Sequence, residues 1–521
     1  MTLLNLRGLY SSRQSCHKAD PPHRNSNPAS LGPMLPVKAD EQDETPAEDD
    51  IGSTWPIIIF SSIIATGGLI FGYDIGTIGG MIDMPAFVNT FGDRQTGGQI
   101  AFHSITKGAL IGISSLGGFV GGILSISLIT PFGLRATIFS AGVIYAVGNL
   151  VTVTAFVWIQ VMFGRALNGM ANGIICVTCP MLISELAPAS MRGGMICIQQ
   201  LLTTVGIQLG AVTMYFCQSL FENTSTLQFK VPLIQGLFWA VAVCVLIWFV
   251  PESPYWYLTN RNLVEKSKLS VARARSLGVN DPGVLRIVAL MFNNHSCEDD
   301  DANLKEKNSI RKGEPKYLLR TLTGISVLCC QQLTGINYFF FFGTTIFATI
   351  GLTNPYLVPV FFGFVNLVFS VVSLFIVDRY KRTSLLMTGS ALLACFMLLF
   401  TIVSMLSKIN MNVAMGVVMV SLSCGFIGVF ATTWGPLSGV VVSELYPISI
   451  KVKAMSICGS MSWLVTFVMT LVTPPLTEVF GFGIGFVFFF FNVTGLALVY
   501  SLVPETKGLP IERLDEIYEQ Q

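Results

Sequence analysis

Long apolar stretches alternate with short polar ones along most of the chain. About twelve of these stretches begin near residues 56, 106, 136, 157, 194, 231, 320, 356, 384, 411, 453 and 481. Each is long enough to span a bilayer, whose hydrocarbon core a helix of roughly 20 residues crosses. The pattern therefore predicts an all-α membrane protein with twelve transmembrane helices.

The polar stretches divide the predicted spans into two groups of six. Residues 1–54 are rich in Pro, Ser and acidic residues and contain no short cleavable apolar segment, which predicts a disordered tail. We expect a first six-helix bundle at 55–250 and a second at 319–503. Between them, residues 251–318 form a predicted linker with short helices, and residues 504–521 form a short C-terminal tail.

Composition agrees with a membrane protein and excludes several other classes. Only 12% of the residues are charged and 52% are hydrophobic, whereas a soluble protein is about a quarter charged. The net charge of +1 gives no support for a nucleic-acid partner. Most of the 12 cysteines lie in apolar stretches without metal-ligand spacing. The four histidines form no set with a nucleophile, so we expect no enzyme, cofactor or metal.

The distribution of Lys and Arg predicts the orientation in the membrane. About a dozen of them lie in the linker, and very few lie in the turns on the other side. By the positive-inside rule the linker is cytoplasmic, and with an even number of spans both termini are cytoplasmic too. The sequon at Asn223 then lies on the outer side, between the fifth and sixth predicted spans, as a candidate glycosylation site.

Two short motifs occur twice. SELAP at 184–188 recurs as SELYP at 443–447, an offset of 259 residues, and PESP at 251–254 recurs as PETKG at 504–508, an offset of 253. The nearly equal offsets indicate two halves in parallel orientation, with a binding site near the midplane that opens alternately to each side. The alternative is that these motifs merely cap helices.

The repeated motifs also place opposite charges near the predicted cytoplasmic helix ends. Glu185 is close to Arg192, and Glu444 is close to Lys451. Exposed ion pairs contribute roughly 0 to 1 kcal/mol each, which suits a gate that opens and closes. We therefore interpret these four residues as gate residues.

Several motifs together resemble one family. They are FGYDIG (71–76), GRALNG (164–169), PMLISELAP (180–188), PESP, QQLTGINYFFFFGTTIF (331–347), ATTWGP (431–436), SELYP and PETKG. The set is similar to the sugar porters of the major facilitator superfamily, and the segment from residue 331 to 347 to fungal hexose transporters. The resemblance covers about residues 55–515. It implies the major facilitator fold and a monomeric hexose transporter of the plasma membrane.

A sugar site needs neutral groups that donate and accept hydrogen bonds, together with an apolar surface for the ring. The predicted seventh span supplies Gln331, Gln332 and Asn337. Along a straight helix Gln331 and Asn337 point to different faces, but Gly335 between them permits a break. The alternative is that these amides only join helices to each other.

The resemblance implies further sugar contacts at Gln200, Asn366 and Trp463. This sequence departs from the family pattern at two nearby positions. Ser462 replaces the asparagine that usually precedes the tryptophan, and the aromatic residue of the tenth span falls near Gly439. We therefore expect a more open sugar cavity with an altered preference.

The resemblance also pairs Asp74 in the first span with Arg165 in the fourth. In proton-coupled relatives this pair carries the proton, but downhill facilitators keep the same aspartate.

In the second half, Asp378 and Arg379 match a gate motif, whereas the matching loop at 129–135 lacks its acid and one base. Three functions stay open at this point: a hexose facilitator, a proton-coupled sugar symporter, and a sensor that binds glucose without moving it. The short segment after PETKG favours transport over sensing.

Overall fold

The computed structural model describes residues 53–94, 100–188, 191–261, 263–292, 317–348, 355–377, 379–407, 413–446, 448–507 and 517–518. Nearly all of the predicted N-terminal tail lies outside these residues, as do the second part of the linker and most of the C-terminal tail.

Six long helices make up the first half of the bundle. They are α1 (Trp55–Ile82), α3 (Ser104–Phe132), α4 (Leu134–Val153), α5 (Trp158–Leu186), α6 (Arg192–Leu220) and α7 (Leu227–Leu246), which continues into the 3-10 turn η3 (Ile247–Phe249). Between α1 and α3 lie the short helix α2 (Pro85–Phe91) and the strands β1 (Asp93–Arg94) and β2 (Ile100–Ala101), which pair antiparallel. This strand pair is the only departure from an all-α fold in the described part of the chain.

The second half contains six spans, two of which are built from two helices each. The elements are α11 (Tyr317–Leu333), α12 (Ile336–Ala348), α13 (Leu357–Val377), α14 (Arg382–Ser407), α15 (Val413–Thr432), α16 (Trp434–Glu444), α17 (Ile448–Phe480), the 3-10 turn η4 (Gly481–Gly483) and α18 (Ile484–Leu502). Helices α11 and α12 form one span, and α15 and α16 form another.

The helices have the length and composition of membrane spans. Within the described residues, 11 helical stretches qualify, and one of them, Ile450–Leu502, is 53 residues long. That stretch holds α17 and α18, so it crosses a bilayer twice. Every predicted span begins within five residues of an observed helix start. The prediction of twelve spans in an all-α membrane protein is confirmed.

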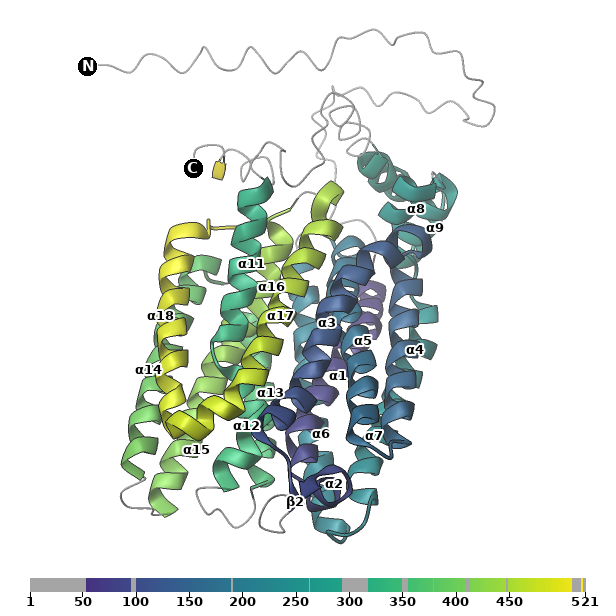
Figure 1. Cartoon of the computed structure of the whole chain (residues 1–521). Coiled ribbons are helices and arrows are strands. Elements are labelled where there is room, and N and C mark those ends of the chain that lie inside the picture. The colour runs from purple at the N-terminus through teal and green to yellow at the C-terminus, as the bar shows by residue number, and fades with distance from the viewer. Residues whose placement is uncertain are drawn as a thin grey trace, which may run out of the picture. The chain divides into compact units, whose positions relative to one another are not determined.

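Short helices gather at one end of the bundle, which we call the linker end (Figure 1). They are α8 (Pro254–Arg261), α9 (Val264–Arg275) and a helix at Pro282–Phe292. Leu258, Val271, Val284 and Ile287 form their small apolar core. The helix α2 and the strand pair lie at the opposite end.

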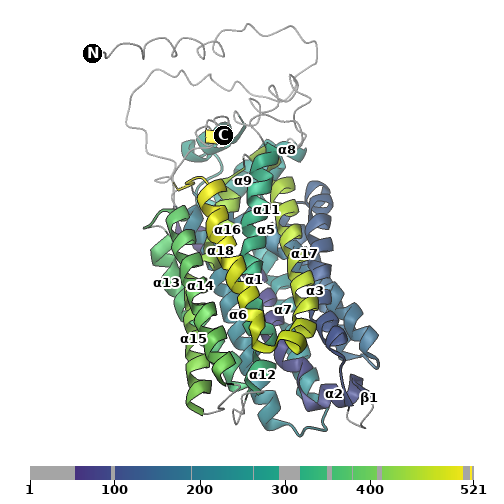
Figure 2. The ribbon, with the colours of Figure 1, turned by 60° about the vertical axis from the view of Figure 1, so that its left-hand side comes forward.

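The two halves meet along two pairs of long helices. Helix α3 packs along α17, and α6 packs along α13; Figure 2 shows α3 and α17 side by side. Glycines on α3 allow close contact on two sides. A Cβ atom at Gly117 would lie 2.1 Å from the carbonyl oxygen of Ala166 on α5, and one at Gly118 would lie 2.6 Å from the ring of Trp463 on α17. These glycines therefore serve packing within the bundle.

Candidate functional site

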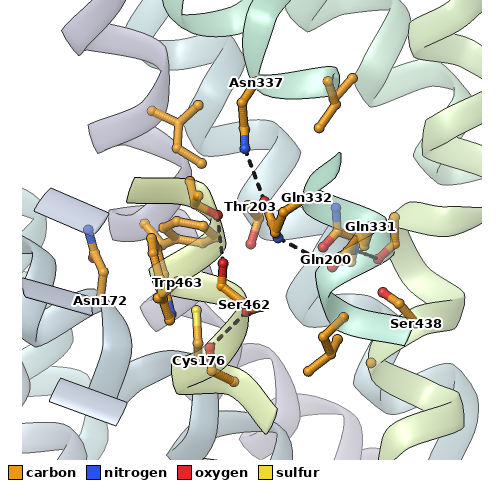
Figure 3. Close-up of a pocket in the computed structure, with 18 of the residues that line it drawn as sticks. Asn172, Cys176, Gln200, Thr203, Gln331, Gln332, Asn337, Ser438, Ser462 and Trp463 are labelled. Atoms are coloured by element: carbon orange, nitrogen blue, oxygen red, sulfur yellow. Dashed lines mark hydrogen bonds between the residues drawn. The ribbon is translucent and has the colours of Figure 1, made fainter. Parts of the chain in front are cut away.

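A cavity of about 270 Å³ lies between the two halves. Helices α1, α3, α5 and α6 line it from the first half, and α11, α12, α13, α15, α16 and α17 from the second. All eight residues that the sequence assigned to sugar binding or proton coupling line this one cavity: Asp74, Arg165, Gln200, Gln331, Gln332, Asn337, Asn366 and Trp463. Several of them are drawn in Figure 3.

The break in the seventh span explains how its amides reach the same cavity. Gly335, between α11 and α12, has a φ of 97°, in the left-handed region that favours glycine. The break lets the Asn337 side chain donate a hydrogen bond to Gln332, with 3.0 Å between Nδ2 and Oε1. Asn492 on α18 donates to the carbonyl of Thr334, at 2.9 Å, and so satisfies a backbone group next to the break.

Gln331 connects this break to the one in the tenth span. Its Nε2 atom lies 3.1 Å from the carbonyl oxygen of Trp434 and 3.2 Å from that of Gly435, at the start of α16. Its Oε1 atom accepts a hydrogen bond from Gln332 at 3.5 Å. Gln331 thus combines a structural contact between helices with a place in the cavity wall.

The aromatic surface of the cavity includes Trp463 on α17. Phe71 on α1 packs edge-on against it, with the ring centroids 5.3 Å apart. On the facing helix α16, Gly439 leaves open space, because an added Cβ atom would meet nothing within 4 Å. The more open cavity expected from Gly439 and Ser462 stays a prediction.

Asp74 and Arg165 form a buried ion pair at the cavity wall. Their exposed fractions are 7% and 3%, and Arg165 Nη1 lies 3.3 Å from Asp74 Oδ1. The other carboxylate oxygen accepts hydrogen bonds from Ser114 Oγ at 3.2 Å and Asn172 Nδ2 at 3.3 Å. Arg165 also donates from Nε to the carbonyl of Leu110. Three donors on two other helices thus converge on this one carboxylate.

Several polar residues of the first half that line the cavity were not predicted from the sequence. They are Ser114, Ser115, Asn172, Gln199 and Thr203. A signal for Asn172 was present, because it follows Arg165 by seven residues and two helical turns bring both to the same face. Isolated Ser and Thr residues carry no comparable signal, because in apolar helices they commonly bond to their own backbone.

The repeated motifs form equivalent hydrogen bonds at the linker end. Ser253 of PESP donates from its hydroxyl to Glu185 of SELAP. Thr506 of PETKG donates to Glu444 of SELYP, at 2.5 Å. Glu444 also forms an ion pair with Arg382 at 3.6 Å, a residue that the sequence analysis did not include in the gate.

The second acidic residue of each motif pair caps a helix. Glu252 accepts hydrogen bonds from the backbone N–H groups of Leu134 and Arg135, at the start of α4. Glu505 accepts them from the N–H groups of Arg382 and Thr383, at the start of α14. Carboxylates stabilise helix N-termini in this way.

The pKa values of these two caps are shifted in opposite directions. Burial raises the pKa of Glu252, although the N–H groups of Arg135 and Ser253 act against it. Burial also acts to raise the pKa of Glu505, but hydrogen bonds from Arg382, Thr383 and Lys507 outweigh it, so that this pKa is lowered.

Other predicted gate residues have different surroundings. Lys451 is buried and its Nζ atom lies 3.4 Å from the hydroxyl of Ser184, which connects α17 to α5 across the two halves. Arg379 is exposed, and its carbonyl oxygen accepts a hydrogen bond from Lys507. Asp378 and the side chain of Arg192 lie outside the described residues.

The candidate glycosylation site is on the turn between α6 and α7, at the end opposite the linker. Asn223 is exposed, and its Oδ1 atom accepts a hydrogen bond from Gln228 at 3.3 Å. An exposed turn is accessible to a modifying enzyme.

Comparisons with known proteins agree with this architecture. The family model of the sugar (and other) transporters matches residues 60–518. Hexose transporter HXT10 of Saccharomyces cerevisiae is 33% identical over 474 residues, which cover 90% of this chain and 86% of that protein. Hexose transporter 2 of Kluyveromyces lactis is 31% identical over 523 residues, which cover 96% of this chain and 91% of that protein.

Solved structures of the major facilitator superfamily share the fold. The proton:xylose symporter XylE bound to 6-bromo-6-deoxy-D-glucose has a TM-score of 0.75 at 23% identity, over 90% of this chain and all of that one. The inward-open form of XylE from E. coli has a TM-score of 0.69 at 21% identity. The match covers 88% of this chain and 99% of that one. The family match and the fold lead to one conclusion: this chain belongs to the sugar (and other) transporter family.

Proposed function

We propose that this protein carries a hexose across the plasma membrane by alternating access, as a downhill facilitator. The hexose transporters to which it is similar over about nine-tenths of its length support a hexose as substrate. A glucose-like monosaccharide is the ligand class that best fits the site described above.

The cavity between the halves carries this proposal. Gln200, Gln331, Gln332, Asn337 and Asn366 offer it neutral amides that both donate and accept hydrogen bonds. Trp463 adds an aromatic surface suited to the apolar face of a sugar ring. A neutral ligand rich in hydroxyl groups satisfies such a lining without requiring a buried countercharge.

Contacts between the halves at both ends of the bundle support alternating access. At the linker end, Lys451 of the second half contacts Ser184 of the first. At the opposite end, the hydroxyl of Thr344 on α12 donates to Asp83, next to α1, at 2.7 Å. We propose that each set of contacts breaks in turn as residues 55–250 and 319–503 rock against each other.

For orientation, we propose that the linker end is cytoplasmic and that both termini are cytoplasmic. The basic residues of the linker support this orientation through the positive-inside rule. Asn223 then faces the outside of the cell. A glycosidase-sensitive mobility shift that disappears in Asn223→Gln would support this, whereas modification of an engineered sequon in the linker would overturn it.

We further propose a monomer as the working unit, because both halves that line the cavity belong to one chain.

A proton-coupled symporter is the second candidate, and one observation favours it. Asp74 is a buried carboxylate that lines the cavity and is paired with Arg165, an arrangement in which protonation would release the arginine. That carboxylate already accepts hydrogen bonds from three donors, as in a structural contact between helices, and this arrangement favours the facilitator.

Uptake of labelled glucose in yeast that lacks its own hexose carriers distinguishes these functions. A facilitator equilibrates glucose without accumulation, and a protonophore leaves the initial rate unchanged. A symporter accumulates glucose until the protonophore is added. Surface-located protein that binds glucose without uptake would indicate a sensor. Surface-located protein that neither binds nor transports any hexose would overturn the proposal.

A further inference from the structure

Asn172 on α5 is a polar residue in the cavity wall whose amide orientation is fixed by its neighbour. Its Nδ2 atom lies 3.3 Å from Asp74 Oδ2, and an ionised carboxylate only accepts hydrogen bonds. The nitrogen must therefore face Asp74, which settles the assignment of the two amide atoms. The carbonyl oxygen consequently points elsewhere.

That oxygen has no hydrogen-bond partner among the described residues, although the side chain is only 1% exposed. A buried acceptor left without a donor costs about 1 to 3 kcal/mol. Buried polar groups of this kind are normally satisfied, so an orphaned one beside a cavity indicates a ligand or an ordered water. Asn172 is among the residues drawn around the pocket in Figure 3.

A second orphaned acceptor lines the same cavity. Gln199 on α6 is 9% exposed, and its Oε1 atom likewise has no partner among the described residues. By contrast, the three amides of the seventh span are bonded to one another, from Asn337 to Gln332 and from Gln332 to Gln331. Among the described residues that line the cavity, the unused buried acceptors thus lie on the first half, where a ligand that donates hydrogen bonds would complete the site.

We infer that Asn172 binds a hydroxyl group of the substrate and connects it to the Asp74–Arg165 pair. This inference rests on the proposed transport of a neutral sugar. A sugar hydroxyl donates to Asn172 Oδ1, while Asn172 Nδ2 donates to Asp74. Hydrogen bonds in such a chain polarise one another, so occupation of the cavity strengthens the bond to Asp74. Asn172 is therefore a specificity-determining residue of the first half.

The decisive test compares Asn172→Ala with the wild type in competition by a series of monodeoxy glucoses. For the hydroxyl that donates to Asn172, its removal should weaken wild-type affinity about three- to tenfold. In Asn172→Ala the affinity for glucose itself should fall by a similar factor, and the same deoxy sugar should bind no worse than glucose. If every deoxy sugar loses the same factor in both proteins, water rather than sugar occupies the acceptor and the inference is wrong.

Asn168→Ala provides the matched control. Asn168 lies one helical turn before Asn172 on α5 and is equally buried, but it donates to Asn149 and does not line the cavity. We expect this variant to leave the ranking of the deoxy sugars unchanged. A change as large as that in Asn172→Ala would mean that loss of any buried amide of α5 produces the effect.

A second measurement on wild-type protein needs no variant to fold. Fluorine accepts but does not donate hydrogen bonds, so at the position that faces Asn172 a fluoro sugar should lose as much affinity as the deoxy sugar. A fluoro sugar that restores binding at every position would contradict the inference. If the wild type transports no hexose at all, the proposed function itself fails, and that result is distinct from either outcome above.

Discussion

The hydroxyl of Thr506 lies 2.5 Å from the carboxylate of Glu444, and Ser253 donates to Glu185 at the equivalent place in the first half. Each bond joins a residue just after the last helix of its half to the end of the fourth span of that half. The duplicated motifs therefore record one interaction built twice. Both bonds lie within a half and hold in place the helix ends that meet the other half at the linker end, because Ser184, next to Glu185, contacts Lys451 of the second half.

Ser253→Ala and Thr506→Ala should each favour the state that is open at the linker end. At about 1 kcal/mol for a partly exposed hydrogen bond to a carboxylate, one substitution shifts the ratio of the two states about fivefold, and the double variant shifts it further. The native thiol of Cys176, which lines the cavity, can report the shift. We expect faster labelling by a membrane-impermeant thiol reagent applied from the linker side, in a background without the other cysteines.

The conservative variants Ser253→Thr and Thr506→Ser keep a hydroxyl and serve as controls, with labelling close to that of the parent protein. Unchanged or slower labelling in both alanine variants and in the double variant would show that these bonds are static caps. The repeat would then reflect common ancestry of the halves rather than a gate.

The two helix caps should respond differently to pH. For Glu505 the pKa in the folded protein is lowered, so its stabilising effect is complete above the unfolded value of about 4.3 and is lost as the pH falls through the folded value. For Glu252 the folded pKa is raised, so the ionised form is disfavoured and stability declines as the pH rises through that value. At neutral pH, Glu505→Gln should therefore lower the unfolding temperature more than Glu252→Gln does.

Thermal unfolding of the purified variants from pH 4 to pH 7 measures this difference. The cost of Glu505→Gln relative to wild type should shrink toward pH 4, whereas that of Glu252→Gln should not. Equal costs for both variants at every pH would mean that the two caps are electrostatically equivalent.

Much of the fold follows from hydrophobicity alone, because a span is a local property of about 20 residues. The start of α1 at Trp55 and that of α14 at Arg382 are predicted within two residues. The break at Gly335 is also predictable, because three amides within one span need a common face. The antiparallel contact of Asp93 with Ala101 is not, because two-residue strands carry no periodic signal.

Some residues of the site could likewise be predicted from the sequence, and others could not. Chemistry predicts Gln331 and Asn337, because amides in an apolar span are costly unless they are used. The contact of Gln331 with the backbone at Trp434 depends on a second helix break 100 residues further along, so spacing along one helix cannot reveal it. The ion pair of Glu444 with Arg382 was not foreseen for the same reason, because Arg382 is far from Glu444 in the sequence.

Gly335→Ala should reduce sugar affinity strongly. At a φ of 97° an alanine is strained by about 1 to 3 kcal/mol, and its Cβ atom would lie 2.8 Å from the ring of Phe488. The relief of this strain should move α12 and lengthen the 3.0 Å bond between Asn337 and Gln332. We expect a rise of about tenfold or more in the Michaelis constant for hexose uptake. For comparison, Gln331→Ala or Asn337→Ala removes one neutral hydrogen bond and should cost a few-fold to tenfold.

Gly343→Ala is the matched control in the same span. A Cβ atom there meets Phe362 at an ordinary 3.7 Å, so uptake should stay close to wild type. Equal kinetics for Gly335→Ala and Gly343→Ala would show that the break does not position the amides.

Asp74→Asn tests how sugar movement is driven. The carboxylate accepts hydrogen bonds from Arg165, Ser114 and Asn172, whereas an asparagine has one acceptor and one amino group. The amino group must face at least one of these donors, and Arg165 loses its countercharge. Breaking a buried ion pair costs about 3 to 5 kcal/mol, so we expect less protein at the surface and a slower cycle.

Counterflow of labelled hexose in proteoliposomes, corrected for the amount of protein, distinguishes downhill transport from proton-coupled transport. In a facilitator, exchange persists in Asp74→Asn and an imposed pH gradient changes neither the variant nor the wild type. In a symporter, the gradient drives accumulation by the wild type only, because the amide cannot take up and release the proton, while exchange survives in both. Accumulation that remains in Asp74→Asn would rule out this carboxylate as the proton carrier and leave the ion pair with Arg165 as a structural contact between α1 and α5.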